Sequence, residues 1–393
     1  RMKATITFFP VDNGDMTLIK LSDGTAILAD INLRESAEDE GHPAYDAAKG
    51  LRDKLEPDVE GRPYVDAFLL SHPDQDHCRG LQKHFHLGPL SDYDFDPPEG
   101  EKLKIVMQEI WSSPMIFRRA NKKDHPLCED AKAFNSEARR RVKCFRDKGN
   151  LKEGDRIVII GEDEEGKTKG LEPILVRVDE KFNTINGETK DDISISVLGP
   201  FPVQKDMEEE ERLKKNHSSV ILRYSLAAGG LDDACLFLSG GDAGVYIWEK
   251  MWEKKKNKTS DIEYDLLFTP HHCSWHSLSH DSWSKDEDPK VSKGAKSALS
   301  QAREGALIVS SSKPIKNDKN DPPCWGAKKE YLPVTKKVNG EFYCTGEHPN
   351  EEAPEPLIFK ITKQGPQPPS KKSVPVAGAA VTSGSTKEPR YHG

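Results

Sequence analysis

Short apolar runs separated by turn residues dominate the start of the chain. Residues 4–9 are β-rich and residues 12–15 supply turn chemistry ahead of an alternating apolar and polar stretch, a pattern that predicts a β-hairpin. Two nearly continuous apolar runs follow at 25–29 and 65–70, as expected for buried strands. A helix is predicted between them, at 44–55.

The middle of the chain has a different character. Residues 88–150 carry little β signal apart from a candidate strand at 105–111, and they include a charged, helix-like stretch at about 128–145, so we interpret this segment as an insertion. Five further short apolar runs then predict a second sheet. These runs are 156–160, 174–178, 193–198, 219–224 and 235–238.

The remaining ordered part of the chain alternates helices with strands. We expect helices at about 243–256 and 296–303 and strands at 264–268 and 306–310. Residues 364–393 are rich in Pro, Ser, Gly and Lys and lack apolar periodicity, which predicts a disordered tail. The expected organisation is one domain at 1–363 followed by this tail.

Composition and charge narrow the class of protein. The formal net charge of -8 argues against a surface that is basic throughout, as nucleic-acid-binding surfaces usually are, although a local basic strip remains open. The 7 cysteines are odd in number and never form a Cys-x-x-Cys pair, which favours reduced thiols. No apolar stretch approaches the roughly 20 residues of a membrane span, so we expect a cytoplasmic protein without a membrane partner.

The densest cluster of chemically active residues follows the run at 65–70. His72, Asp74, Asp76 and His77 place four potential metal ligands within six positions directly after a predicted strand. Side chains at i and i+2 of a strand end point to the same side, and the following turn brings the other two around a second ion. Mixed nitrogen and oxygen ligands suit Zn²⁺, Mn²⁺ or Fe. The alternative is a polar helix-capping turn with surface histidines.

This run resembles the signature of the metallo-β-lactamase superfamily, His-x-His-x-Asp-His after a strand, with Asp74 in place of the second histidine. The His-x-Asp-x-Asp-His variant is similar to the branch that contains the ComEC-type competence nuclease domain. Further landmarks of that branch occur in its order. They are the segment 11–15, Asp30, and the segments 216–222, 238–242 and 270–274, where Cys273 replaces a glycine.

The resemblance implies an α/β fold, the αββα sandwich of two mixed β-sheets flanked by helices, with two divalent ions, Zn²⁺ or Mn²⁺. It implies that Asp242 bridges the two ions and that one of His271 and His272 ligates the second. Neighbouring residues on an extended strand end point in opposite directions, so we expect only one of them to be a ligand. His217 is either a ligand or a solvent-facing or substrate-contacting residue, and Asp30 is expected to anchor a loop.

Two metal ions would lower the pKa of a bound water and stabilise an in-line displacement. The catalytic residues would be Asp74, Asp76 and His77, with one of the two carboxylates relaying the proton. The resemblance favours phosphodiesters, DNA or RNA first, and therefore a nuclease or phosphodiesterase.

Basic residues in the interpreted insertion fit a nucleic-acid partner. Arg118 and Arg119 open the basic run 118–123, and Arg139 and Arg140 belong to a second cluster, where they could hold backbone phosphates. A solvated helix face explains these residues equally well. Two other functions remain open: hydrolysis of a small phosphodiester, ester or lactone, and a non-catalytic metal-binding module that recruits proteins through 88–150 and the tail.

Overall fold

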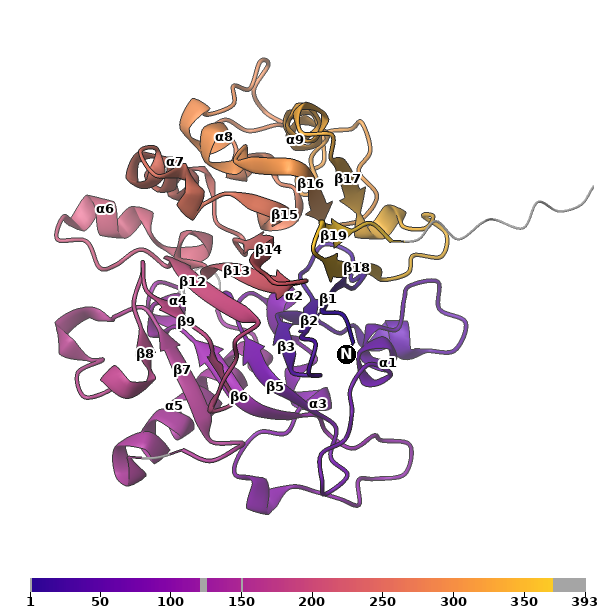
Figure 1. The fold of residues 1–393 in the computed structure, drawn as a ribbon, viewed down its shortest axis with the longest axis vertical. Coiled ribbons are helices and arrows are strands. Elements are labelled where there is room, and N and C mark those ends of the chain that lie inside the picture. The colour runs from indigo at the N-terminus through magenta and orange to yellow at the C-terminus, as the bar shows by residue number, and fades with distance from the viewer. Residues whose placement is uncertain (1, 121–125, 150, 370–393) are drawn as a thin grey trace, which may run out of the picture.

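Two large mixed β-sheets form the centre of the protein (Figure 1). The computed structural model describes residues 2–120, 126–149 and 151–369. Within them the first sheet has nine strands, in the order β19 (Gly365–Gln367), β18 (Leu357–Thr362), β1 (Thr5–Phe8), β2 (Thr17–Lys20), β3 (Ala26–Ala29), β5 (Tyr64–Leu69), β6 (Val106–Ser112), β7 (Arg156–Ile160) and β8 (Leu175–Val176).

The second sheet of the described chain has seven strands. Their order is β17 (Glu341–Cys344), β16 (Ala302–Ser310), β15 (Tyr264–Phe268), β14 (Leu231–Ser239), β13 (Ile221–Ala228), β12 (Ile193–Gly199) and β9 (Lys181–Phe182). Each sheet is parallel on one side and antiparallel on the other. The parallel strands are β3, β5, β6, β7 and β8 in the first sheet and β14, β15, β16 and β17 in the second.

Helices lie outside the two sheets. In Figure 1, α7 (Val245–Lys255), α8 (Lys293–Leu299) and α9 (Trp325–Lys337) lie beyond the second sheet, whereas α3 (Leu81–His84) and α5 (Glu129–Lys148) lie beyond the first. The remaining α-helices of the described residues are α1 (Ala47–Arg52), α2 (Gln75–Cys78), α4 (Pro114–Arg118) and α6 (Met207–Arg212). The prediction of two mixed sheets is confirmed, and the layer order is compatible with a sandwich.

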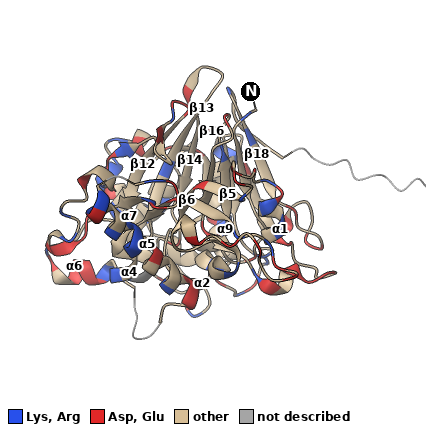
Figure 2. Cartoon of the chain, turned by 90° about the horizontal axis from the view of Figure 1, so that it is seen from below, with Lys and Arg blue, Asp and Glu red and all other residues tan. Residues whose placement is uncertain are grey.

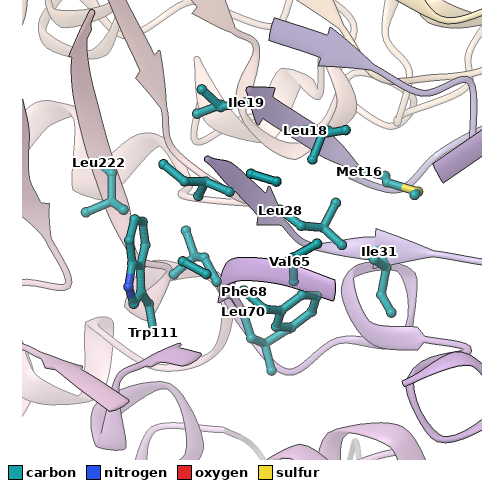
Figure 3. Close-up of a cluster of buried hydrophobic side chains, with 14 of the residues drawn as sticks. Met16, Leu18, Ile19, Leu28, Ile31, Val65, Phe68, Leu70, Trp111 and Leu222 are labelled. Carbon is teal, nitrogen blue, oxygen red and sulfur yellow. The ribbon is translucent and has the colours of Figure 1, made fainter. Parts of the chain in front are cut away.

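The two sheets bury their facing apolar side chains in one core. Figure 3 shows Trp111 from β6 beside Leu222 from β13, which belong to opposite sheets. The ring of Phe8 on β1 meets that of Phe237 on β14, with centroids 5.6 Å apart in an edge-to-face arrangement. Each fully buried side chain of this size contributes about 1.5–3 kcal/mol to stability. The core therefore fixes how the two sheets face each other.

The interpretation of 88–150 as an insertion is wrong. Its candidate strand is β6, which pairs with β5 and β7 inside the first sheet. Helix α5 is fastened to that sheet by Arg141, which is 1% exposed and donates to Glu137 and to the backbone carbonyls of Met107 and Arg156. Polar residues on β6 weaken its strand signal, although all seven positions are buried.

Two other expectations need correction. The runs at 156–160 and 174–178 form β7 and β8 of the first sheet, because the preceding helix α5 returns the chain to that sheet. The tail does not begin at 364, because β19 pairs with β18, which itself pairs with β1. Residues 370–393 of the expected tail lie outside the described residues.

None of the helices in the described part of the chain combines the length and apolar character of a bilayer-spanning segment.

Glu109 provides a test of the buried position of β6. Its carboxylate, 4% exposed, accepts a hydrogen bond of 2.7 Å from the indole N–H of Trp111, and burial raises its pKa from 4.5 to about 7. Between those values the folded state holds a proton that the unfolded state releases, so this group makes stability fall as pH rises. We predict that Glu109→Gln reduces this fall.

Denaturant unfolding of the wild type and the variant at pH 5 and pH 7.5 measures the effect. The wild type should lose stability relative to Glu109→Gln on going to pH 7.5. The exposed residue Glu101 provides a control, and Glu101→Gln should leave the profile unchanged. A wild type that gains stability relative to Glu109→Gln at the higher pH would contradict the buried placement.

Candidate metal centre

Asp242 lies at the centre of a cluster of four histidines. Its side chain, 3% exposed, follows the end of β14. Its Oδ2 atom is 3.4 Å from His72 Nε2 and 3.6 Å from His271 Nε2. Its Oδ1 atom is 3.2 Å from His77 Nε2 and 3.6 Å from His272 Nε2. The two carboxylate oxygens therefore each face a different histidine pair.

Further carboxylates lie beside each of the two histidine pairs. Beside Oδ2, Asp74 Oδ2 lies 3.7 Å from His72 Nε2. Beside Oδ1, Asp76 Oδ2 lies 3.2 Å from His272 Nε2, and Asp15 Oδ1 lies 3.2 Å from His272 Nδ1. We call His72, Asp74 and His271 the first half-site, and Asp15, Asp76, His77 and His272 the second half-site. Asp242 belongs to both.

Asp30 fixes the loop that carries the histidines after β5. Its Oδ1 accepts the Ser71 backbone N–H at 2.7 Å, and its Oδ2 accepts the Ser71 hydroxyl at 2.5 Å. The same Oδ2 lies 2.8 Å from His77 Nδ1. A proton on Nδ1, donated to Asp30, leaves Nε2 free to face Asp242. The prediction that Asp30 anchors a loop is confirmed.

The backbone at His271 and His272 explains why both histidines face Asp242. These residues and Cys273 have φ values of +52°, +53° and +65°, in the left-handed region that few residues other than glycine adopt. Neighbouring side chains of an extended chain would point in opposite directions, whereas these positive φ values turn both histidines toward Asp242. The expectation that only one of them is a ligand stays a prediction. Three such residues in succession are strained, as is common at functional sites.

Several buried polar atoms of the cluster lack a hydrogen-bond partner among the described residues. They are Asp15 Oδ1, His72 Nε2, His77 Nε2, Asp242 Oδ1 and His272 Nδ1. Buried polar atoms are normally paired, because desolvation without a partner is costly. One ligand atom from each of Asp15, His77, Asp242 and His272 lies within 4.8 Å of the others, so this group could hold a metal ion.

The carboxylates of the centre raise the pKa values of two of its histidines. Burial favours the neutral form of His272, yet Asp242, Asp15 and Asp76 raise its pKa to about 10. Asp242, Asp30 and Asp15 likewise raise the pKa of His77 well above its usual value against the effect of burial. Since a metal ligand must be deprotonated, ion binding at these histidines has to release protons.

The centre forms the floor of an open cleft of about 900 Å³. Among the described residues, those that line its floor include His72, Asp74, Asp76, Asp242 and His271. The walls come from α4, the start of α5 and the segments around 214–217 and 276–280. The segment interpreted as an insertion thus contributes one wall, through α4 and α5.

His217 lies on the wall of this cleft, outside both half-sites. Its Nδ1 is 2.6 Å from the backbone carbonyl oxygen of Arg212, and burial lowers the pKa of the ring. Gly244 lies close to its other side, where an added Cβ would come within 2.4 Å of His217 Nε2. This position disfavours the role of a metal ligand and leaves a solvent-facing or substrate-contacting residue.

The predicted phosphate-binding arginines are mostly engaged within the protein. Arg119 is 2% exposed and donates to Glu210 and to the Phe201 carbonyl, so its predicted role in phosphate binding is wrong. Arg118 pairs with Asp163 and Glu210.

Helix α5 carries the second predicted pair of arginines. Arg140 pairs with Glu137 and Asp155. Arg139 is exposed and lines a separate hollow. Residues 121–123 of the first basic run lie outside the described residues.

Asp15 is the site residue that the sequence did not reveal. From the sequence, Asp15 is only part of a turn and of the landmark at 11–15. The available signal is its position at the end of that landmark, directly after the turn residues Asn13 and Gly14. The Asp15 backbone N–H donates to the carbonyl of Asp76 at 3.2 Å, which draws the hairpin turn against the histidine loop.

None of the known family models matches this chain, and no curated protein matches it as a relative.

Replacement of Asp242 by alanine tests whether this residue belongs to both half-sites. We predict that Asp242→Ala loses bound metal from one or both half-sites, because each would lose a carboxylate oxygen. Metal content after dialysis against Zn²⁺, followed by gel filtration, measures this. Asp232→Ala is the matched control, since Asp232 is exposed on β14. An Asp242→Ala protein with wild-type metal content would remove Asp242 from the centre.

Asp30 tests the orientation of His77. We predict that Asp30→Asn weakens Zn²⁺ binding by about 10- to 100-fold, the usual effect of losing a group that orients a ligand. Competition with a chromophoric chelator measures the affinity. Asp39→Asn provides a control, because Asp39 is exposed. Equal affinities for Asp30→Asn and the wild type would show that the His77–Asp30 contact does not support metal binding.

Proposed function

We propose that this protein is a dinuclear metallohydrolase of the metallo-β-lactamase superfamily and that phosphodiesters are its substrates. The observation that carries the proposal is the position of Asp242, whose two oxygens face separate histidine pairs at the floor of an open cleft. The ordered landmarks of the sequence support the superfamily. They meet in space at the carboxyl ends of strands from both sheets, where ligands commonly bind in α/β folds.

In this proposal each half-site holds one ion. His72, Asp74 and His271 would ligate the first ion, and Asp76, His77 and His272 would ligate the second. Asp242 would contribute one oxygen to each, and Asp15 would complete or orient the second half-site. Imidazole and carboxylate ligands without cysteine suit Zn²⁺ or Mn²⁺. When bound, such ions supply an activated water and stabilise the charge of an in-line displacement.

The residues of the cleft have separate tasks. Asp74 is the most open carboxylate of the centre, with 54% of its side chain exposed, so it can exchange a proton with solvent. Asp76, at 32%, is the next most open. His77 is fully buried between Asp30 and Asp242, which fits a fixed ligand better than a proton relay.

The cleft walls offer donors for phosphate oxygens. Lys214, Asn216, His217, His276 and His280 line the cleft together with the carboxylates of the floor. These side chains can donate hydrogen bonds or carry positive charge. An anionic phosphodiester placed between donors on the wall and cations on the floor would be held at both ends.

A small phosphodiester is a second candidate substrate. It is favoured because most of the arginines predicted to bind nucleic-acid phosphates form ion pairs within the protein instead. Arg118, Arg119 and Arg140 all face internal carboxylates. Acidic residues are also clustered in α6 (Figure 2), next to the segment at 214–217 that lines the cleft. A long nucleic acid would pass this acidic surface, whereas a small substrate would not.

The decisive experiment compares substrates on one metal-loaded preparation. We predict that protein dialysed against Mn²⁺ or Zn²⁺ hydrolyses bis-p-nitrophenyl phosphate and that Asp74→Ala/His77→Ala reduces the rate by at least about 100-fold, because ion binding is lost. Asp39→Ala is the surface control. Metal-loaded wild-type protein that leaves all phosphodiesters intact would contradict the proposed reaction.

Labelled single- and double-stranded DNA and RNA, tested in parallel, separate the two substrate classes. Arg139→Glu is the informative variant, because Arg140→Glu would also break the ion pairs of Arg140 with Glu137 and Asp155. If nucleic acid is the substrate and follows this helix, Arg139→Glu should weaken its binding and lower the salt dependence by about one phosphate contact. An unchanged nucleic-acid binding isotherm would show that Arg139 belongs to a solvated helix face and does not bind phosphate.

A further inference from the structure

Two thiols from distant parts of the chain meet beside the metal centre. Cys78 ends α2 directly after His77, and Cys128 caps the start of α5. Their Sγ atoms lie 3.5 Å apart. Asp130 holds the two segments together, because its carboxylate accepts the backbone N–H of Gly80 at 2.9 Å and that of Gln82 at 3.0 Å. The thiol contact is therefore built into the packing of α5.

The two thiols differ in exposure. Cys78 is fully buried, whereas Cys128 is half-buried and lines the wall of the cleft. The hydrogen bond from the Cys78 thiol, with help from the Ala131 backbone N–H at 3.5 Å, lowers the pKa of Cys128 to about 7. A thiol at the start of a helix is commonly activated in this way. A reagent in the cleft would therefore meet a nucleophilic Cys128 first.

The geometry points to an oxidisable dithiol, in which Cys128 reacts with a peroxide and Cys78 then closes a reversible disulfide at the wall of the cleft. No thiol–thiol hydrogen bond joins any other pair of the described cysteines. Burial raises the pKa of Cys235 and Cys344, which keeps both as neutral thiols and makes them suitable controls.

The reaction balances with hydrogen peroxide as the oxidant. The Cys128 thiolate attacks one peroxide oxygen, so that an S–O bond forms, the O–O bond breaks and the second oxygen leaves as water after protonation. The Cys78 thiol then attacks that sulfur, the S–S bond forms, and the hydroxyl leaves as water with the proton of Cys78. Two thiols and one peroxide thus give one disulfide and two waters. The sulfurs have to close from 3.5 Å to about 2.05 Å.

Formation of the disulfide would move the loop that carries the proposed metal ligands. The Cys78 Sγ atom also lies 3.3 Å from the carbonyl oxygen of Asp74, so its single thiol hydrogen is shared between Cys128 and this carbonyl, a contact that spans Asp76 and His77. A disulfide removes this donor and pulls Cys78 toward α5. We therefore expect oxidation to weaken metal binding by about tenfold or more, as when a ligand loses its orienting contact. This consequence, unlike the disulfide itself, rests on the proposed metal centre.

Peptide mapping tests the disulfide. The full chain, free of metal, is treated with a small excess of hydrogen peroxide, alkylated and digested. The expected product is a peptide that joins Cys78 to Cys128, lighter by two hydrogens and released by dithiothreitol. Cys128→Ser should abolish it and leave Cys78 unmodified, whereas Cys344→Ser should still form it. Oxidation of Cys128 to sulfinic acid with Cys78 still reduced would overturn the proposal.

A second reagent tests the thiol pair without oxidation or substitution. Phenylarsine oxide bridges adjacent thiols, so the reduced wild type should bind it with both Cys78 and Cys128 protected from alkylation. Protection of any other cysteine pair in their place would overturn the assignment.

Mn²⁺ binding tests the consequence, because Mn²⁺ prefers oxygen and nitrogen ligands to thiols. Reduced and disulfide-bonded protein are titrated with Mn²⁺, and free Mn²⁺ is followed by electron paramagnetic resonance. Weaker binding by the oxidised form supports the coupling, and equal binding removes it. Reduced protein that binds no Mn²⁺ would contradict the proposed function, while the mapped disulfide would stand independently.

Discussion

The burial of the Asp242 carboxylate is the constraint on which the rest of the site depends. A charged group that is 3% exposed is strongly destabilising unless it is surrounded by compensating charge. Four histidines supply that environment, two from the loop after β5 in the first sheet and two from the loop after β15 in the second. The carboxylate can be accommodated only where both loops meet, so the centre lies at the seam between the sheets.

Direct contacts hold this seam at a fixed spacing. The Val220 backbone N–H donates to the Ser71 carbonyl at 2.9 Å, and the Ser311 hydroxyl donates to the Gly14 carbonyl at 2.6 Å. Gly14 is required by space, because an added Cβ would come within 2.8 Å of the Asp76 carbonyl oxygen. The hairpin turn thereby reaches the histidine loop and brings Asp15 to the second half-site. Ligand geometry is thus a consequence of how the sheets pack.

The sequence reveals those parts of this arrangement that are local. His72 to His77 are consecutive and follow a clear apolar strand, so their proximity needs no knowledge of the fold. The bridging role of Asp242 is implied by the resemblance alone, and the structure shows that its carboxylate lies between four histidines. The orientation of His271 and His272 was missed because it depends on positive φ values that their residue types do not favour. The role of Asp15 depends on contacts between distant loops.

The errors in the fold have the same origin. Strand β6 contains Gln108 and Glu109 at buried positions, so the pattern predicted a strand but not that it lies in the middle of the first sheet. The two sheets could not be separated from strand patterns, because the crossover through α5 decides that β7 joins the first sheet. Arg119 looked like a surface cation, yet Glu210 and the Phe201 carbonyl compensate it in the interior. Each of these features is set by partners far away in the chain.

X-ray absorption spectroscopy on zinc-loaded protein tests the central claim most directly, because it measures ligand types and the distance between ions without requiring a substrate. A carboxylate shared by two half-sites predicts two ions per chain, nitrogen and oxygen ligands, and a second metal at about 3.5–4 Å from the first. One ion per chain with no metal neighbour would contradict the account, because Asp242 would then serve a single site.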